Sequence, residues 1–169
     1  KQFEQETDLF ILLDSYDEIT LENDKKVHKD RKNQSFYICQ GDQKIGVLAS
    51  QHAIYKSILE PVEWNELISK RLIPDEALLI FETNTLYIVE KKFQKGTGSV
   101  DEKLQTCDFK KKIYQRLVEG LNYEVEMIYL LNDFFTSPKY EDVLKYIEDS
   151  NCKYVYNSLS LEDFGIFLK

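Results

Sequence analysis

Two carboxylates and an amine stand at a spacing that could support phosphodiester chemistry. Asp75 follows Pro74, and fourteen residues separate Asp75 from Glu90, which Lys92 follows two positions later. Carboxylate oxygens are ligands of hard divalent cations, and Mg²⁺ is usually held by one or two of them together with phosphate oxygens of a substrate. Such an ion lowers the pKa of a bound water and neutralises charge that builds on a phosphoryl group. These residue types therefore predict a metal-dependent hydrolase, provided that the fold brings them together.

The elements that must position these residues are the two strands of a hairpin. Apolar runs at 77–82 and 86–93 are rich in β-branched and aromatic residues, and a short polar step, Thr83-Asn84-Thr85, separates them. This pattern is typical of two strands joined by a turn. Because strand side chains alternate between faces, Glu90 and Lys92 share one face of the second strand.

The register of this hairpin decides which acidic residue of the first strand joins Glu90 and Lys92. A two-residue loop, Thr83-Asn84, places Asp75 opposite Lys92 and on the face of Glu90. A loop one residue longer presents Glu76 there instead. Of these two registers we favour the one with Asp75.

The same residues resemble a known nuclease signature. Pro74-Asp75 and Glu90-Lys91-Lys92 match the PD-(D/E)xK pattern of the restriction-endonuclease-like superfamily, and the resemblance covers roughly residues 62–131. It implies that Asp75 and Glu90 bind one or two Mg²⁺ ions, with the main-chain carbonyl of Lys91 as a further ligand. It also implies that Asp75, Glu90 and Lys92 are the catalytic residues, with Lys92 orienting or activating the attacking water.

The resemblance also points to residues beside the motif. Gln94 occupies a position that touches substrate or metal in some members of the superfamily. In many members the helix before the aspartate lends another acidic group to the metal site. Glu63 and Glu66 are the candidates for that role here, and we favour a solvent-facing role for both.

A basic block directly follows the carboxylates. The formal charge of −8 speaks against a simple nucleic-acid binder, but it divides into −3 for residues 1–73, −4 for 74–90, +5 for 91–116 and −6 for 117–169. A basic surface beside carboxylates that metal ions partly neutralise suits a DNA backbone. For the lysines of this block, a solvated helix face is an equally open interpretation. The residues predicted to contact DNA are Gln94, Lys95, Ser99, Lys103 and Lys110.

The order of the expected elements predicts an α/β fold. Helices and strands alternate from residue 62 onwards, so we expect a mixed β-sheet flanked by helices. The resemblance implies a restriction-endonuclease-like core at about 62–157, and residues 1–61 are expected to add a helical and hairpin extension to the same single domain of 1–169. The expected helices are 1–13, 50–59, 62–72, 100–119, 139–149 and 160–167, and the strands expected outside the motif hairpin are 36–40, 44–49, 123–131 and 153–157.

Composition excludes several other classes of protein. With 169 residues and 43% hydrophobic content, the chain can form a packed globular core. It has no apolar run near the ~18 residues of a membrane span and no basic-then-apolar leader, so we expect a soluble cytoplasmic protein. Cys39, Cys107 and Cys152 are odd in number and widely spaced, which predicts reduced core thiols rather than a zinc site or a disulfide framework. His28 and His52 are too few for a histidine metal cage.

These observations predict a Mg²⁺-dependent endodeoxyribonuclease that cuts double-stranded DNA, most plausibly a type II site-specific restriction endonuclease. A homodimer is expected because two-fold protein symmetry matches a palindromic site. Two alternatives stay open: a structure-specific repair or junction nuclease, and a non-catalytic DNA- or protein-binding module on a nuclease-like core. The acidic net charge favours the second alternative, whereas the presence of all three motif residues speaks against it.

Overall fold

The fold is built on one mixed sheet whose strands lie side by side in the order of the sequence. The computed structural model describes residues 7–23, 33–96, 98 and 100–168. Its seven strands, ordered β1 to β7 across the sheet, confirm the α/β class and the mixed sheet. Strands β1 to β5 pair antiparallel, and β5, β6 and β7 pair parallel. The strands are β1 Ile19–Glu22, β2 Ser35–Gln40, β3 Gln43–Ser50, β4 Glu76–Ile80, β5 Thr85–Lys92, β6 Glu124–Leu131 and β7 Lys153–Tyr156.

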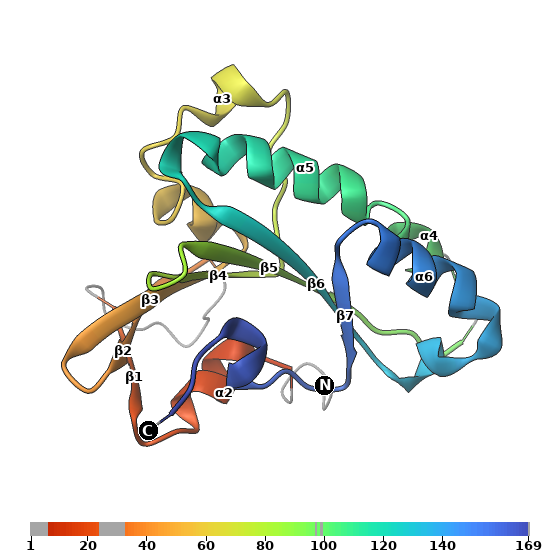
Figure 1. Cartoon of the computed structure of the whole chain (residues 1–169), viewed down its shortest axis with the longest axis horizontal. Coiled ribbons are helices and arrows are strands. Elements are labelled where there is room, and N and C mark those ends of the chain that lie inside the picture. The colour runs from red at the N-terminus through yellow and green to blue at the C-terminus, as the bar shows by residue number, and fades with distance from the viewer. Residues whose placement is uncertain (1–6, 24–32, 97, 99, 169) are drawn as a thin grey trace.

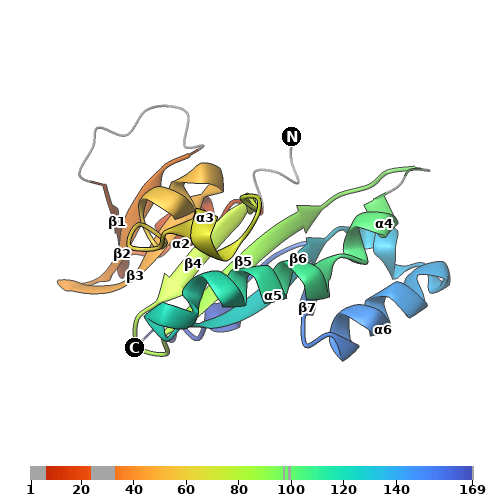
Figure 2. The same cartoon turned by 90° about the horizontal axis from the view of Figure 1, so that it is seen from above.

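Helices cover both faces of the sheet (Figure 1). The α-helices are α2 Leu9–Asp14, α3 Trp64–Leu67, α4 Val100–Leu104, α5 Cys107–Val118 and α6 Glu141–Asp149. The 3₁₀-helices are η1 Gln51–Lys56, η2 Glu119–Leu121, η3 Asp133–Thr136, η4 Pro138–Tyr140 and η5 Leu161–Phe164. Helices α3, α5 and α6 lie on one face, onto which Figure 2 looks, and α2 lies with the C-terminal segment on the other.

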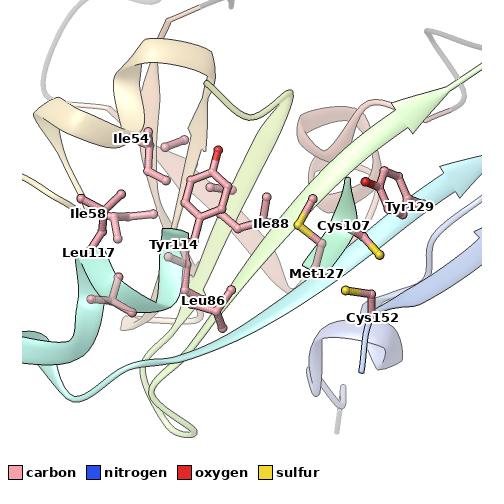
Figure 3. Close-up of a cluster of buried hydrophobic side chains, with 14 of the residues drawn as sticks. Ile54, Ile58, Leu86, Ile88, Cys107, Tyr114, Leu117, Met127, Tyr129 and Cys152 are labelled. Atoms are coloured by element: carbon pink, nitrogen blue, oxygen red, sulfur yellow. The ribbon is translucent and has the colours of Figure 1, made fainter. Parts of the chain in front are cut away.

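Strand β5 separates two hydrophobic clusters. Leu86 and Ile88 point to the α5 face, where they join Tyr114 and Leu117 of α5 (Figure 3). Tyr87 and Val89, in the alternate positions, belong to the cluster that includes Leu9 of α2 and Phe164 of η5. A strand buried on both faces is expected to be apolar almost throughout. This alternation makes Glu90 the next residue on the α5 face and Lys91 the next on the α2 face.

Local patterns predicted most strands well. The expected strands at 36–40, 44–49, 77–82, 86–93, 123–131 and 153–157 are confirmed within a few residues, as is the helix at 139–149. The polar segment after the first helix contains the edge strand β1. The expected helices at 50–59 and 160–167 were wrong in type, because η1 and η5 are short 3₁₀-helices. The expected helix at 1–13 is found only as α2, and residues 1–6 lie outside the described part of the chain.

The predicted helix at 62–72 is much shorter than expected. Only Trp64–Leu67 is helical, and Ile68 is already extended with φ −136° and ψ 154°. Ile68 is buried, whereas Leu67 is 41% exposed. From Ile68 the chain runs towards Pro74, and a proline disfavours helix in the residue before it.

The predicted helix at 100–119 is broken into α4 and α5. The hydroxyl of Thr106 donates to the carbonyl of Lys103 at 2.8 Å, and Gln105 N–H donates to Glu102 O at 3.2 Å. Threonine hydroxyls compete with backbone groups in this way, which interrupts helices. The break makes Cys107 the first residue of α5. In the described part of the chain, none of the helices has the length and apolar character that crossing a membrane requires.

Candidate active site

The hairpin of β4 and β5 has a longer loop than predicted. Glu76 pairs with Val89 and Ile80 pairs with Thr85, so the loop comprises the four residues 81–84. Asn84 takes the left-handed conformation with φ 50°, which asparagine tolerates better than most residues. The expected two-residue loop was therefore wrong.

This correction changes which residue Asp75 faces. One position beyond the Glu76–Val89 pair, the observed register places Asp75 opposite Glu90 rather than opposite Lys92. The difference is two residues, and a two-residue shift leaves every side chain on its original face. Asp75, Glu90 and Lys92 thus occupy one face, as the sequence suggested, and Glu76 points to the other.

Asp75 is fixed by a backbone contact with the motif strand. Its Oδ2 accepts the N–H of Lys91 at 2.7 Å. Pro74 precedes Asp75 outside β4, and proline has no N–H to donate to a partner strand. The N–H and C=O of one strand residue point to the same neighbour. The Lys91 carbonyl therefore faces the side of Asp75 without a proline N–H to occupy it.

Glu90 is a buried carboxylate between two ammonium groups. Lys92 Nζ lies 3.3 Å from Glu90 Oε2, and Lys110 Nζ lies 3.9 Å from Glu90 Oε1. The Glu90 side chain is 7% exposed, against 15% for Lys92 and 23% for Lys110. The strand supplies the first lysine and helix α5 supplies the second, so the carboxylate sits where β5 and α5 meet.

The acidic groups influence one another. Burial raises the pKa of Glu90, the two lysines oppose this effect, and the negative charge of Asp75 adds to it. Burial also raises the pKa of Tyr114 on α5, and Glu90 and Asp75 act in the same direction. Electrostatic coupling of this kind requires the three side chains to be near each other. Two carboxylates and two lysines thus form one group of interacting charges at the site.

The opposite face of the hairpin has a structural ion pair. Lys91 Nζ lies 2.9 Å from Glu76 Oε2, and Glu76 also accepts the N–H of Leu9 at the start of α2. Burial raises the pKa of Glu76 to about 7, although Lys91 lowers it. Glu76 thus ties α2 to the sheet and stands apart from the Asp75 face.

The residues predicted to contact DNA fall into different environments. Lys110 reaches Glu90, whereas Lys95 and Lys103 are exposed and Lys95 lies 5.5 Å from the Phe93 ring centre. Gln94 is buried. Ser99 lies outside the described residues.

Gln94 is held by the neighbouring parallel strand. Its backbone N–H donates to Asn132 Oδ1 at 3.2 Å, and Asn132 Nδ2 donates to the Gln94 carbonyl at 2.8 Å. Its side-chain Nε2 donates to the carbonyl of Gly96. The side-chain Oε1 is buried without a hydrogen-bond partner among the described residues. The Asn132 contacts thus fix the chain just beyond Lys92.

The donor set fits a hard divalent cation that is completed by water or substrate. Asp75 and Glu90 have carboxylate oxygens, which are the type of ligand that Mg²⁺ prefers. Among the residues that the structure describes, no three His, Cys, Asp or Glu side chains are grouped to hold a metal. Glu63 and Glu66 are both exposed. The remaining ligands would then be carbonyl, water and phosphate oxygens.

Two contributions to this neighbourhood were missed in the sequence. The sequence predicts a DNA contact for Lys110 but not its pairing with Glu90. Nothing in the sequence pattern singles out Tyr114. Both lie on α5 four positions apart, a spacing that places side chains on one helix face. That spacing could have grouped them, but only the packing of α5 shows that they face Glu90.

Comparisons of the chain with protein-family models, with curated proteins and with solved structures find no match. Function is therefore inferred from the geometry of the site.

Proposed function

We propose that this protein is a Mg²⁺-dependent endodeoxyribonuclease of the PD-(D/E)xK type, and more specifically a type II restriction endonuclease. A restriction-endonuclease-like core needs a hairpin that carries the site and a helix that crosses to the next strand. Here β4 and β5 form the hairpin, and α4 and α5 connect β5 to the parallel strand β6. The architecture is thus compatible with the proposed core.

The observation that carries the proposal is the position of Asp75 opposite Glu90, with Lys92 bonded to Glu90. The register brings both carboxylates to one face, and Lys92 Nζ is 3.3 Å from Glu90 Oε2. A solvated strand end would leave such groups exposed, yet Glu90 is 5% exposed. Burying a carboxylate costs free energy unless it is paired, so a buried acidic cluster is a functional-site candidate.

Each of these residues has its own role in the proposed hydrolysis of a phosphodiester. Asp75, Glu90 and the carbonyl of Lys91 would hold the metal. Once bound, the metal supplies a water of lowered pKa and offsets charge on the phosphoryl group. Lys92 orients the attacking water and can hold a proton at Nζ. Lys110, on the helix above, is placed to bind a phosphate oxygen of the substrate.

Double-stranded DNA is the proposed substrate, and a cytoplasmic homodimer is the proposed form. Residues 91–116 carry a basic block, and most of α5 lies within it. Positive charge there attracts the phosphate backbone and positions the duplex. A two-fold dimer would present two such sites to a palindrome.

A cleavage assay tests the proposal. Supercoiled plasmid is incubated with the protein in the presence of Mg²⁺ or a chelator, and the same reactions are run with Asp75→Asn, Glu90→Gln and Lys92→Ala. We expect Mg²⁺-dependent cutting by the parent protein. Loss of a proton-transfer group typically costs 10²–10⁴-fold, so we expect Lys92→Ala to cut roughly 10³-fold more slowly.

Glu82→Gln is the matched control, because Glu82 is an exposed carboxylate in the loop at the other end of the same hairpin. It should cut like the parent. Discrete bands from unmodified plasmid favour a restriction enzyme, and preferential cutting of branched DNA favours a repair or junction nuclease. Nuclease activity that is equal in the parent and all three site variants would contradict the assignment. Full folding without any cutting would favour the non-catalytic module.

A further inference from the structure

Two cysteines that are far apart in the sequence meet on the α5 face of the sheet. Cys107 is the first residue of α5, and Cys152 directly precedes β7. All three cysteines are free and buried, as the sequence predicted. The close-up in Figure 3 shows the sulfur atoms of Cys107 and Cys152 beside each other. The wide sequence spacing gave no sign of this pair.

The two thiols lie next to each other and close to the surface (Figure 3). Cys152 Sγ donates to the carbonyl oxygen of Ser150 at 3.6 Å. Cys107 is fully buried and Cys152 is 4% exposed, but neighbouring Tyr146 is 37% exposed. The pair thus lies where a water-sized reagent needs only a small local opening to reach it.

The backbone around each cysteine is well anchored. Cys152 N–H donates to the carbonyl of Ile147 at the end of α6, at 3.0 Å. Lys110 N–H donates to Thr106 O at 3.0 Å, which closes the first turn of α5 around Cys107. Because both segments are held by secondary structure, the two sulfurs stay together in the folded protein.

We propose that Cys107 and Cys152 form a redox-active pair that hydrogen peroxide converts to an intramolecular disulfide. This site is independent of the proposed nuclease activity. The oxidant class is a small hydroperoxide, because its size matches the limited access to the pair.

The two cysteines have different roles in this reaction. The nearby Cys152 thiol lowers the pKa of Cys107, against the opposing effect of burial. The backbone of Asp108, in the first turn of α5, lowers the pKa of Cys107 as well. The same contact with Cys107 raises the pKa of Cys152, and burial adds to this. Since thiolate is the nucleophile, Cys107 reacts first and Cys152 resolves the intermediate.

The chemistry balances in two steps. The Cys107 thiolate attacks one oxygen of hydrogen peroxide, an S–O bond forms, the O–O bond breaks, and hydroxide leaves to become water. Cys152 then attacks the sulfenic sulfur, an S–S bond forms, the S–O bond breaks, and a second water leaves with the Cys152 proton. The two thiols lose two electrons and two protons in total, and one peroxide is reduced to two waters.

The bond would join the start of α5 to the start of β7. Lys110 stands one turn further along α5 and contacts Glu90. The disulfide would therefore fix the helix end nearest to that lysine.

The test is mass spectrometry of the folded full chain. The protein is treated with hydrogen peroxide below its unfolding transition, alkylated without reduction, and analysed intact and after proteolysis. We expect an intact mass lower by two hydrogen atoms, a cross-linked peptide that contains Cys107 and Cys152, and full reversal by dithiothreitol. Circular dichroism before and after treatment shows that the chain is folded.

Variants separate this site from other thiol chemistry. Cys39→Ala is the matched control, because Cys39 lies on β2 and is buried like the other two. It should keep the cross-link. Cys152→Ala should lose it and leave a sulfenic acid on Cys107 that reacts with dimedone.

Three results overturn the proposal: no oxidation of the folded parent chain, oxidation of Cys107 to sulfinic or sulfonic acid without a disulfide, or a cross-link that involves Cys39. Each can be read from the parent chain alone, so the test does not depend on a variant that folds.

Discussion

Lys110 Nζ lies 3.9 Å from Glu90 Oε1, so a helix and a strand each contribute to the environment of one buried carboxylate. Lys92 pairs with the other oxygen of the same group. Both carboxylate oxygens of Glu90 therefore face a positive charge. Under the proposed function, a cation at Glu90 would compete with these ammonium groups, and Lys110 would then be released to contact a phosphate.

Replacing Lys110 tests this arrangement. Lys110→Met removes a positive charge next to the proposed scissile phosphate, so we expect the cleavage rate to fall by at least about tenfold. The control is Lys112→Met on the same helix, because Lys112 is 72% exposed and pairs with Asp108 at 2.8 Å. Initial rates of plasmid cleavage measure both. Equal rates for the two variants would contradict a role for Lys110 in the site.

Lys91→Met tests the ion pair on the opposite face. Lys91 is the partner of buried Glu76 at 2.9 Å, and removing one member of such a pair leaves an uncompensated charge. We expect the free energy of unfolding to fall by about 1–3 kcal/mol, the usual cost of leaving a buried polar group without its partner, measured by urea denaturation. Lys145→Met breaks an exposed pair with Asp149 at 3.5 Å and should change it by under about 0.5 kcal/mol. If both variants lose the same stability, the pair with Glu76 is not structural.

The stability of the protein should depend on pH through Glu76. Its pKa rises from 4.5 to about 7 on folding, so between these values the folded chain keeps a proton that the unfolded chain has released. The contribution of Glu76 to the free energy of unfolding is therefore greatest below pH 4.5. It falls by up to about 3 kcal/mol as the pH rises towards 7.

Glu76→Gln removes this titration. Urea denaturation at several pH values should show a flatter dependence in the variant than in the parent over this window. The same slope in both proteins would assign the pH dependence to other groups. Glu90, whose pKa burial also raises, contributes in the same direction and is unchanged in this comparison.

Gly46 marks a close approach of two strands. A Cβ at this position would collide with the carbonyl oxygen of Leu79 on β4. Gly46 pairs with Ile38, and the register between β2 and β3 shifts at the next residue, as at a β-bulge. We expect Gly46→Ala to destabilise the protein by about 1–3 kcal/mol, because the clash with backbone cannot relax cheaply. Thermal unfolding measures this loss of stability.

Gly120→Ala is the control for that substitution. Nothing lies within 4 Å of a Cβ built on Gly120. The variant should unfold within a few degrees of the parent. A Gly46→Ala protein as stable as Gly120→Ala would show that β3 and β4 can separate at this point without loss.

Strands β2, β3, β5 and β6 were predictable because their signal is local. Alternating or continuous apolar residues bounded by turn residues define a strand within a short window. The same holds for α6, whose buried Leu144 and Ile147 lie three positions apart. The predictions of helices at 62–72 and 100–119 failed. The chain is already extended at Ile68, and the hydroxyl of Thr106 bonds to the backbone where the second helix is interrupted.

The sequence by itself determined that Asp75, Glu90 and Lys92 lie on one face of a hairpin. The loop is two residues longer than predicted, and a register shift of two residues leaves each side chain on the same face. It did not determine that Asp75 faces Glu90, because this depended on a four-residue loop. Nor could it bring Lys110 to Glu90, or Cys107 to Cys152. These neighbours belong to different elements, and only the packing of α5 against the sheet and the course of the chain into β7 place them together. Periodicity describes one element at a time, whereas a site between elements exists only after their apolar faces have been buried against each other.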